Sequence, residues 1–235
     1  MNLKAKYLFF DLDDTLTPNK TVMEDDMFNL LKALPHTKVI VSGANIDQIT
    51  AHTRCLPFYK LGQNGNHAVT NTGEFLWQER LSPVEVEAIN EHVKAIKRFV
   101  SETLDVAHNA LFNHGGQISF SLLKQDTERS VKEAFDPSKT FRRKILEATP
   151  YVHDSIDVTV AGSTSFDYLP KGKHKGYYVQ KFIDLMNWDK DQCLYFGDSF
   201  YPGGNDEPVR GIIETIPVKN HRETYEHLLT LRKLK

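Results

Sequence analysis

Three carboxylates lie within four positions in the segment FFDLDDTLTP, residues 9–18. Asp11, Asp13 and Asp14 directly follow an apolar run, so they stand where a buried strand is expected to end. Charges of one sign repel at this spacing, and an acidic turn in water is the ordinary explanation of such a group. The alternative is that a cation binds there, and the other polar residues of the chain favour this alternative.

A hydroxyl group, an ammonium group and further acids stand at comparable points later in the chain. They are Ser42-Gly43 after the apolar segment KVIV, Lys175 in KGKHKG, Asp198 after CLYF, and the pair Asn205-Asp206 that ends GDSFYPGGND. Taken singly, each is explained by a turn or by a solvated loop. Ser42 and Asp198 follow predicted strands, and Lys175 stands just before the helix that precedes the strand at 192–196. These positions are what make them candidates for a site.

The apolar pattern predicts an alternation of strands and helices at both ends of the chain. Met27, Leu30, Leu31 and Leu34 recur at the spacing of one helix face, and Pro35 ends that helix. The expected elements are strands at 5–10, 38–41, 58–61 and 192–196, with helices at 24–34, 46–54 and 177–186, and a strand and closing helix after 209. Such alternation predicts a parallel sheet with helices on its faces.

The middle of the chain has a different pattern. Residues 68–70 and 75–78 flank a turn and predict a hairpin. Ser82, Pro83 and Glu85 then form a helix start, with a capping serine, proline at the first helical position and glutamate three residues after the cap. Further elements are expected as strands at 117–123, 156–160 and 165–169 and a helix at 139–148. We therefore expect a core domain at 1–81 and 171–235, interrupted by an α+β domain at 82–170.

In an open parallel sheet, the loops at the carboxyl ends of the strands meet in one crevice, where ligands bind. The acids, Ser42 and Lys175 would therefore converge there. This combination suits phosphoryl transfer, since Mg²⁺ binds carboxylate and phosphate oxygens and an Asp carboxylate can act as a nucleophile. Mg²⁺ and Lys175 would stabilise the negative charge on the transferring group and offset the repulsion between the acids.

These motifs resemble those of the haloacid dehalogenase superfamily of phosphotransferases that use an aspartate nucleophile. DLDDT at 11–15 is similar to its DxDxT signature, VSG at 41–43 to its second motif, the lysine of KGKHKG to its third, and GDSFYPGGND at 197–206 to its fourth. The resemblance covers nearly the whole chain. It implies a Rossmann-like α/β core, a parallel sheet with helices on both faces, and an inserted α+β type-two cap domain. The segments FNHGGQISFS and SFDYLPKG are most similar to eukaryotic-type phosphomannomutases.

The resemblance also implies roles for the core residues. Asp11 would be the nucleophile, and Asp13 would act first as the general acid and then as the general base. Thr15 and Ser42-Gly43 would bind the phosphoryl group. Lys175 would hold the phosphate and the nucleophile together.

A magnesium ion is the implied cofactor. Asp11 and Asp198 would be its carboxylate ligands, and Asp13 would contribute its backbone carbonyl. Asn205 and Asp206 would complete or support the metal site.

The chain departs from the phosphomannomutase pattern in the cap. Asn113 and Lys124 stand where that pattern has arginines, and neither side chain replaces a bidentate guanidinium on a second phosphate. Lys124, Arg129, Arg142 and Arg143 remain as sources of positive charge, and with Asn113 they include the candidate substrate residues of the cap. Because a mutase must hold a bisphosphorylated sugar, this weaker cap favours hydrolysis of a small phosphomonoester, a sugar phosphate, over a phosphomannomutase reaction.

Two functions of another class remain open. A phospho-acceptor receiver domain also groups acids, a hydroxyl and a lysine at strand ends, but such domains are much shorter and lack an inserted domain. A catalytically inactive binding protein is possible in principle, although every residue needed for the chemistry is present. The oligomeric state is left open between a monomer and a homodimer formed through the cap.

Composition indicates an ordinary soluble globular protein. Of the 235 residues, 40% are hydrophobic and 26% are charged, and the net charge of −2 favours neither a nucleic-acid nor a membrane partner. No apolar stretch reaches the length of a spanning helix, and no signal sequence is apparent at the start. Two isolated cysteines fit a reducing compartment, so a cytoplasmic location is expected.

Overall fold

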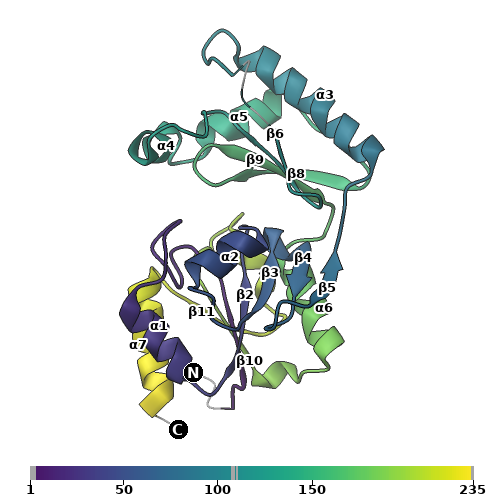
Figure 1. Ribbon diagram of the computed structural model, residues 1–235. Helices are drawn as coiled ribbons and strands as arrows, with labels where there is room; N and C mark the ends of the chain where they lie inside the picture. The colour runs from purple at the N-terminus through teal and green to yellow at the C-terminus, as the bar shows by residue number, and fades with distance from the viewer. Residues whose placement is uncertain (1–3, 107–108, 110, 234–235) are drawn as a thin grey trace. The chain divides into compact units, whose positions relative to one another are not determined.

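The computed structural model describes residues 4–106, 109 and 111–233, and the chain divides into two compact units (Figure 1). The core unit combines the chain up to Gln78 with the chain from Lys173 onward. The inserted unit comprises Glu79–Gly172. This is the α/β class with an insertion that the sequence predicts. Two expectations stay predictions: the role of the inserted unit as a cap, and its domain bounds at 82–170.

The core unit contains a seven-stranded sheet in the order β11-β10-β1-β2-β3-β4-β5. The first five strands in that order are parallel, and β4 and β5 are antiparallel to their neighbours, which confirms the expected hairpin. The strands are β1 (Tyr7–Phe10), β2 (Thr37–Val41), β3 (Tyr59–Gly62), β4 (His67–Val69), β5 (Phe75–Gln78), β10 (Cys193–Gly197) and β11 (Glu214–Pro217).

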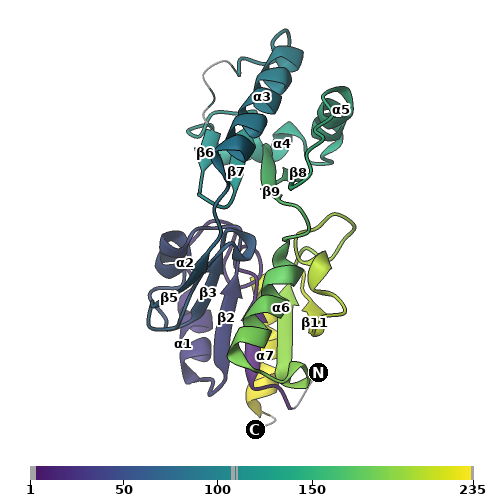
Figure 2. The same cartoon turned by 90° about the vertical axis from the view of Figure 1, so that its right-hand side faces the viewer.

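Helices cover both faces of this sheet (Figure 2). They are α1 (Asp25–Ala33), α2 (Ile46–His52), α6 (Lys175–Met186) and α7 (His221–Lys233). Alternating side chains of β1 point to opposite faces, as a strand requires. Leu8 and Phe10 pack in the cluster that contains residues of α1, α2 and α7, whereas Phe9 packs with Phe182 of α6. The central strands are buried on both sides, which explains their continuous apolar runs.

The inserted unit contains a four-stranded antiparallel sheet in the order β6-β7-β9-β8. Its elements are α3 (Pro83–Val100), β6 (Leu111–Asn113), β7 (Ile118–Ser121), α4 (Arg129–Phe135), α5 (Thr140–Ala148), β8 (Ile156–Ala161) and β9 (Ser165–Pro170). Helix α3 begins with the predicted capping box, in which Ser82 and Glu85 each bond the backbone N–H of the other. The apolar face of α3 packs on Ile118, Phe120 and Phe166.

Two elements of the inserted unit carry too little apolar periodicity to be predicted. Strand β6 has only three residues and none is buried, and no residue of α4 is buried. One boundary also differs, because Lys175 is the first residue of α6, whereas the sequence placed it just before the helix. None of the helices in the described ranges combines the length and the apolar character needed to cross a bilayer.

Candidate active site

The candidate site lies at the carboxyl ends of β1, β2 and β10. These three strands pair in parallel and in register, with Phe10 opposite both Ile40 and Phe196. The ladder continues one residue further, because the Asp11 amide donates to the Phe196 carbonyl oxygen at 2.9 Å. Asp11 is 5% exposed. The sheet therefore fixes the backbone of the candidate nucleophile.

Lys175 joins two carboxylates from opposite ends of the core sequence. Its Nζ donates to Oδ1 of Asp11 at 2.6 Å and to Oδ1 of Asp206 at 2.8 Å. The lysine is 1% exposed and Asp206 is fully buried. Gly176 lets α6 begin this close to the Asp206 loop, since a Cβ there would lie 2.0 Å from the Pro208 carbonyl oxygen.

Three carboxylates of the described chain lie close enough to share one cation. Carboxylate oxygens of Asp11, Asp198 and Asp206 all lie within 4.8 Å of one another. Hard oxygen donors with an excess of negative charge are the set that suits Mg²⁺. Lys175 contributes one positive charge against these three acids, so a divalent cation fits the residues present. Asn205, the remaining predicted side-chain ligand, is exposed in the same loop as Asp206.

The crowding of acids shifts their proton affinities. Burial raises the pKa of Asp11 well above its ordinary value, and the Asp206 and Asp198 charges raise it further against the opposing effect of Lys175. Burial and the charge of Asp206 also raise the pKa of Asp198. Burial alone would lower the pKa of Lys175, but Asp11 and Asp206 outweigh it and raise that pKa. The pKa values of the acids and of the lysine thus rise for different reasons, mainly burial for Asp11 and Asp198 and the neighbouring carboxylates for Lys175.

Asp206 is held by three donors, and the sequence analysis singled out only Lys175 among them. Oδ1 accepts from Lys175 and, at 2.6 Å, from the Tyr195 hydroxyl, and Oδ2 accepts from the Ser199 amide at 3.1 Å. Tyr195 lies in the apolar run of β10, so its sequence pattern is that of an ordinary core residue. The available signal was strand alternation, which places Tyr195 on the same side of β10 as Gly197, the residue before Asp198. Burial raises the pKa of Tyr195 well above its ordinary value, so its hydroxyl remains a donor.

The predicted phosphate-binding hydroxyls are also buried near these strand ends. Thr15 is fully buried, and its Oγ1 has no hydrogen-bond partner within the described ranges. Ser42 follows β2 directly and is 1% exposed, and its Oγ accepts from the Ala44 amide at 3.1 Å. The neighbouring Gly43 is exposed. The unsatisfied Thr15 hydroxyl is what a ligand oxygen would complete.

Asp13 and Asp14 belong to the loop that follows Asp11. Asp13 Oδ1 accepts from the Lys20 amide at 2.6 Å. Asp14 has a positive φ of 58°, and its carboxylate accepts from the amide and the side chain of Asn19. Both carboxylates therefore have partners inside the loop in this structure, and Asp14 acts as a turn residue.

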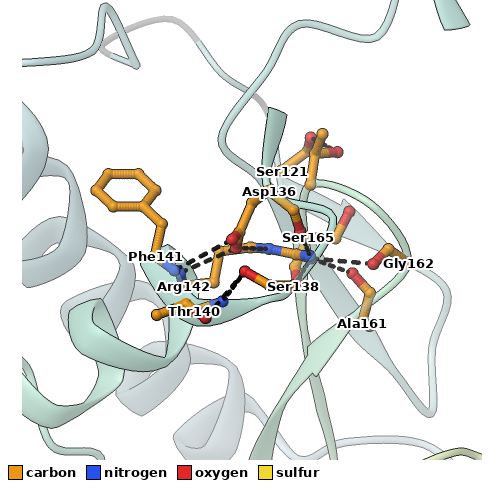
Figure 3. A network of polar contacts seen from close by, with 10 residues as sticks. Ser121, Asp136, Ser138, Thr140, Phe141, Arg142, Ala161, Gly162 and Ser165 are labelled. Atoms are coloured by element: carbon orange, nitrogen blue, oxygen red, sulfur yellow. Dashed lines mark hydrogen bonds and ion pairs between the residues drawn. The ribbon is translucent and has the colours of Figure 1, made fainter. Parts of the chain in front are cut away.

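The structure contradicts the expectation that Arg142 binds substrate. Its side chain is fully buried in the inserted unit and pairs with Asp136 at 3.0 Å. Its Nη1 also donates to the carbonyl oxygens of Ala161, Gly162 and Ser165 (Figure 3). Because these acceptors use the guanidinium inside the fold, Arg142 ties α5 to the β8–β9 turn and exposes no side-chain surface to a ligand.

The other candidate cap residues lie on the surface of the inserted unit. Lys124 and Arg143 are exposed, and Asn113 is exposed at the end of β6, where its Oδ1 accepts from the Gly115 amide. Arg129, also exposed, pairs with Glu133 one helical turn away. Their roles toward a substrate stay predictions.

A polar group on the sheet of the inserted unit was missed by sequence reasoning. Asp167 of β9 accepts from Gln117 at 2.9 Å and from the Ser119 hydroxyl at 2.7 Å. Polar residues at alternate positions of QISFS and SFDYL were the signal for one polar sheet face. The acceptor at its centre is a carboxylate.

Comparisons of the sequence with a family profile and with known proteins agree on one family. The sequence profile of the haloacid dehalogenase-like hydrolases matches residues 8–206. A phosphomannomutase from Oryza sativa subsp. indica is 24% identical over 217 residues, which cover 85% of this chain and 84% of the relative. A phosphomannomutase from Saccharomyces cerevisiae is 26% identical over 219 residues, covering 86% of this chain and 84% of the relative.

Solved structures share the fold at lower identity. A truncated Plasmodium falciparum IMP-nucleotidase superposes with a TM-score of 0.69 at 17% identity, covering 98% of this chain and 71% of the other. A haloacid dehalogenase-like hydrolase from Bacteroides thetaiotaomicron has a TM-score of 0.62 at 14% identity, covering 97% and 99%. The profile match, which spans most of the chain, decides the assignment: the chain belongs to the haloacid dehalogenase-like hydrolase family.

Proposed function

We propose that the protein is a Mg²⁺-dependent phosphatase that hydrolyses a small phosphomonoester, a sugar phosphate, through an aspartyl-phosphate on Asp11. The observation that supports this most directly is the buried Lys175 ammonium shared by Asp11 and Asp206, with Asp198 beside them. A fixed carboxylate, a fixed cation and a candidate metal site are the parts that phosphoryl transfer requires.

In the first step, Asp11 attacks phosphorus and the bond from phosphorus to the leaving oxygen breaks. Lys175 occupies Oδ1 of Asp11, so we assign the attack to Oδ2. Asp13 gives its proton to the leaving oxygen, which departs as a neutral alcohol. For this transfer the Asp13 carboxyl group exchanges its contact with Lys20 for one with the substrate.

In the second step, water attacks the phosphorus of the aspartyl-phosphate. Asp13 takes a proton from that water, the bond from phosphorus to Asp11 breaks, and inorganic phosphate leaves. The buried Thr15 hydroxyl and the loop at Ser42-Gly43 hold the phosphoryl oxygens in both steps. Lys175 keeps the Asp11 carboxylate oriented throughout.

Asp11, Asp198 and the backbone carbonyl of Asp13 would hold Mg²⁺, with Asn205 and Asp206 completing or supporting the set. The ion, when bound, supplies positive charge to the phosphoryl oxygens and reduces the repulsion between the carboxylates.

The choice of hydrolysis over a mutase reaction rests on the inserted unit. A mutase must grip the second phosphate of a bisphosphorylated sugar, for which a guanidinium is the best-suited group. Arg142 is used inside the fold, and Asn113 and Lys124 stand where arginines are expected in mutases.

A sugar phosphomutase is the second candidate. The observation that favours it is that the curated relatives described above are named phosphomannomutases and align over most of this chain. We propose a cytoplasmic location for either activity, as the composition suggests, with a small phosphorylated metabolite as the partner.

Phosphate release from a panel of sugar phosphates and p-nitrophenyl phosphate tests the proposal. We expect Mg²⁺-dependent release that is lost in Asp11→Asn, which keeps the shape of the side chain and removes the nucleophilic charge. An Asp14→Asn variant is the control, because Asp14 belongs to the turn and its αL conformation suits asparagine equally. Release that survives Asp11→Asn would reject Asp11 as the nucleophile.

A further inference from the structure

The Tyr195 hydroxyl is the one neutral side-chain donor in the buried group of Asp206 contacts described above. It lies 2.6 Å from Oδ1 of Asp206, the same oxygen that accepts from Lys175. Tyr195 and Asp206 are both fully buried. Tyr195 is fixed by the β10 ladder and its ring packs against Phe200. The position of the donor is therefore set by the sheet rather than by the loop that carries Asp206.

The terminal torsion of an aspartate is soft, so the directions of its hydrogen bonds decide how the carboxylate is turned. Tyr195 and Lys175 converge on Oδ1, while the Ser199 amide binds Oδ2. Together they permit one orientation of the carboxylate. In that orientation Asp206 holds the Lys175 ammonium where it also reaches Asp11.

Gly197 makes room for this arrangement. A Cβ at Gly197 would lie 2.5 Å from Oδ2 of Asp206 and 2.9 Å from Cε1 of Tyr195. The missing side chain thus admits both groups side by side on one face of β10. A neutral donor also suits a group of three acids and one ammonium, because it stabilises a carboxylate without adding charge.

We infer that Tyr195 is a positioning residue of the reaction, which acts through Asp206 to hold Lys175 against the nucleophile and to keep the acids arranged for a divalent cation. The inference rests on the proposed function for its link to turnover. Its link to cation binding is measured separately. Partners that orient ligand groups change metal affinity or activity about 10-fold to 100-fold when they are removed.

The test compares Tyr195→Phe with Tyr178→Phe. Tyr178 is also fully buried in the same cluster of the core unit, and its hydroxyl donates to a buried amide, Oδ1 of Asn66, at 2.7 Å. Each variant removes one hydroxyl and one buried hydrogen bond. The variants differ in the acceptor of the lost hydrogen bond, which is the Asp206 carboxylate for Tyr195 and the Asn66 amide for Tyr178.

Calorimetric titration with Mg²⁺ alone gives the readout that does not depend on activity. We expect Tyr195→Phe to weaken Mg²⁺ binding about 10-fold, and to lower kcat by a similar factor with little change in KM. Tyr178→Phe should lose about as much thermal stability as Tyr195→Phe, but its Mg²⁺ affinity and its kcat should stay at the wild-type values. Mg²⁺ affinity and kcat equal to the wild type in Tyr195→Phe would overturn the inference, as would equal losses in the two variants.

Two further outcomes separate this inference from the proposed function. If the wild type binds Mg²⁺ and Tyr195→Phe binds it more weakly, but no phosphomonoester is hydrolysed, the proposed function fails and the inference stands. A wild type that does not bind Mg²⁺ overturns the inference.

If Tyr195→Phe does not fold, wild-type protein labelled with ¹³C at the tyrosine Cζ atoms replaces the variant in the test. Addition of Mg²⁺ should then shift a buried tyrosine resonance, and unchanged tyrosine resonances would contradict the inference.

Discussion

The Nζ atom of Lys175 lies 2.6 Å from Oδ1 of Asp11, although 164 residues separate them in the chain. The parallel sheet brings them together, since Asp11 follows β1 and Lys175 opens the helix that leads into β10, the neighbour of β1. Both are buried, so neither charge is stabilised by bulk water. The buried ion pair is therefore an integral part of the site, and we choose it as the first target for mutation.

Replacement of Lys175 by methionine should strongly reduce turnover. The change keeps the length of the side chain and removes the charge that orients Asp11, and we expect kcat to fall about 10²-fold to 10³-fold. Steady-state assays with saturating Mg²⁺ measure this. Lys171→Met is the matched control, since Lys171 is exposed in the same basic segment and should keep full activity. A Lys175→Met enzyme with wild-type kcat would remove the lysine from the mechanism.

Mg²⁺ should change how stability depends on pH. Burial raises the pKa values of Asp11 and Asp198, so without the ion the folded state keeps protons that the unfolded chain releases near the ordinary value of 3.8. The contribution of these two carboxyl groups to stability without Mg²⁺ is therefore largest below that pH, and it is lost as the pH rises through the raised values. Thermal unfolding in EDTA and in excess Mg²⁺ measures the difference. Stabilisation by Mg²⁺ should grow as the pH rises through this window, because ligand carboxylates must lose their protons. Stabilisation independent of pH would contradict the account.

Arg142 and Arg143 are adjacent in α5 and should behave in opposite ways. Arg142→Ala leaves Asp136 unpaired in a buried position, which should lower the free energy of unfolding of the inserted unit by about 3–5 kcal/mol. Arg143→Ala changes an exposed side chain and should lower it by less than about 0.5 kcal/mol. Denaturant unfolding measures both values.

The same pair tests the corrected assignment of the cap residues. At a temperature where both variants are folded, Arg142→Ala should leave KM for the substrate unchanged, because its guanidinium serves the fold. A rise in KM without loss of stability would return Arg142 to the substrate site.

His92 should make the inserted unit sensitive to mild acid. Its Nδ1 lies 2.8 Å from the Tyr168 hydroxyl and its Nε2 lies 2.6 Å from the Thr149 carbonyl oxygen. Burial lowers its pKa below the ordinary value of 6.5. The unfolded chain therefore takes up a proton before the folded chain does, and stability is lost as the pH falls below 6.5. The difference in unfolding free energy between wild type and His92→Gln should shrink across this range. A constant difference would show that the imidazole does not titrate in this window.

The sequence predicted those parts of the site that depend on local pattern. Asp11, Ser42 and Asp198 each follow a strand with a clear apolar signal, so the parallel topology alone brings them to one edge. Strand alternation places Tyr195 on the side of Gly197 but does not identify its partner, because a buried tyrosine in an apolar strand has the same pattern whether its hydroxyl meets a carboxylate or an amide. Arg142 was misassigned for the converse reason, since a charge on a helix gives no sign of a buried partner until the tertiary fold places Asp136 beside it.

The product of a sugar 1-phosphate tests the central claim most directly. Purified protein, Mg²⁺, mannose 1-phosphate and a hexose bisphosphate primer are followed together by ³¹P NMR, with Asp11→Asn as the blank. The account predicts growth of the inorganic phosphate signal, no mannose 6-phosphate, and no reaction in the blank. Conversion to mannose 6-phosphate without release of phosphate would contradict it and establish the phosphomutase.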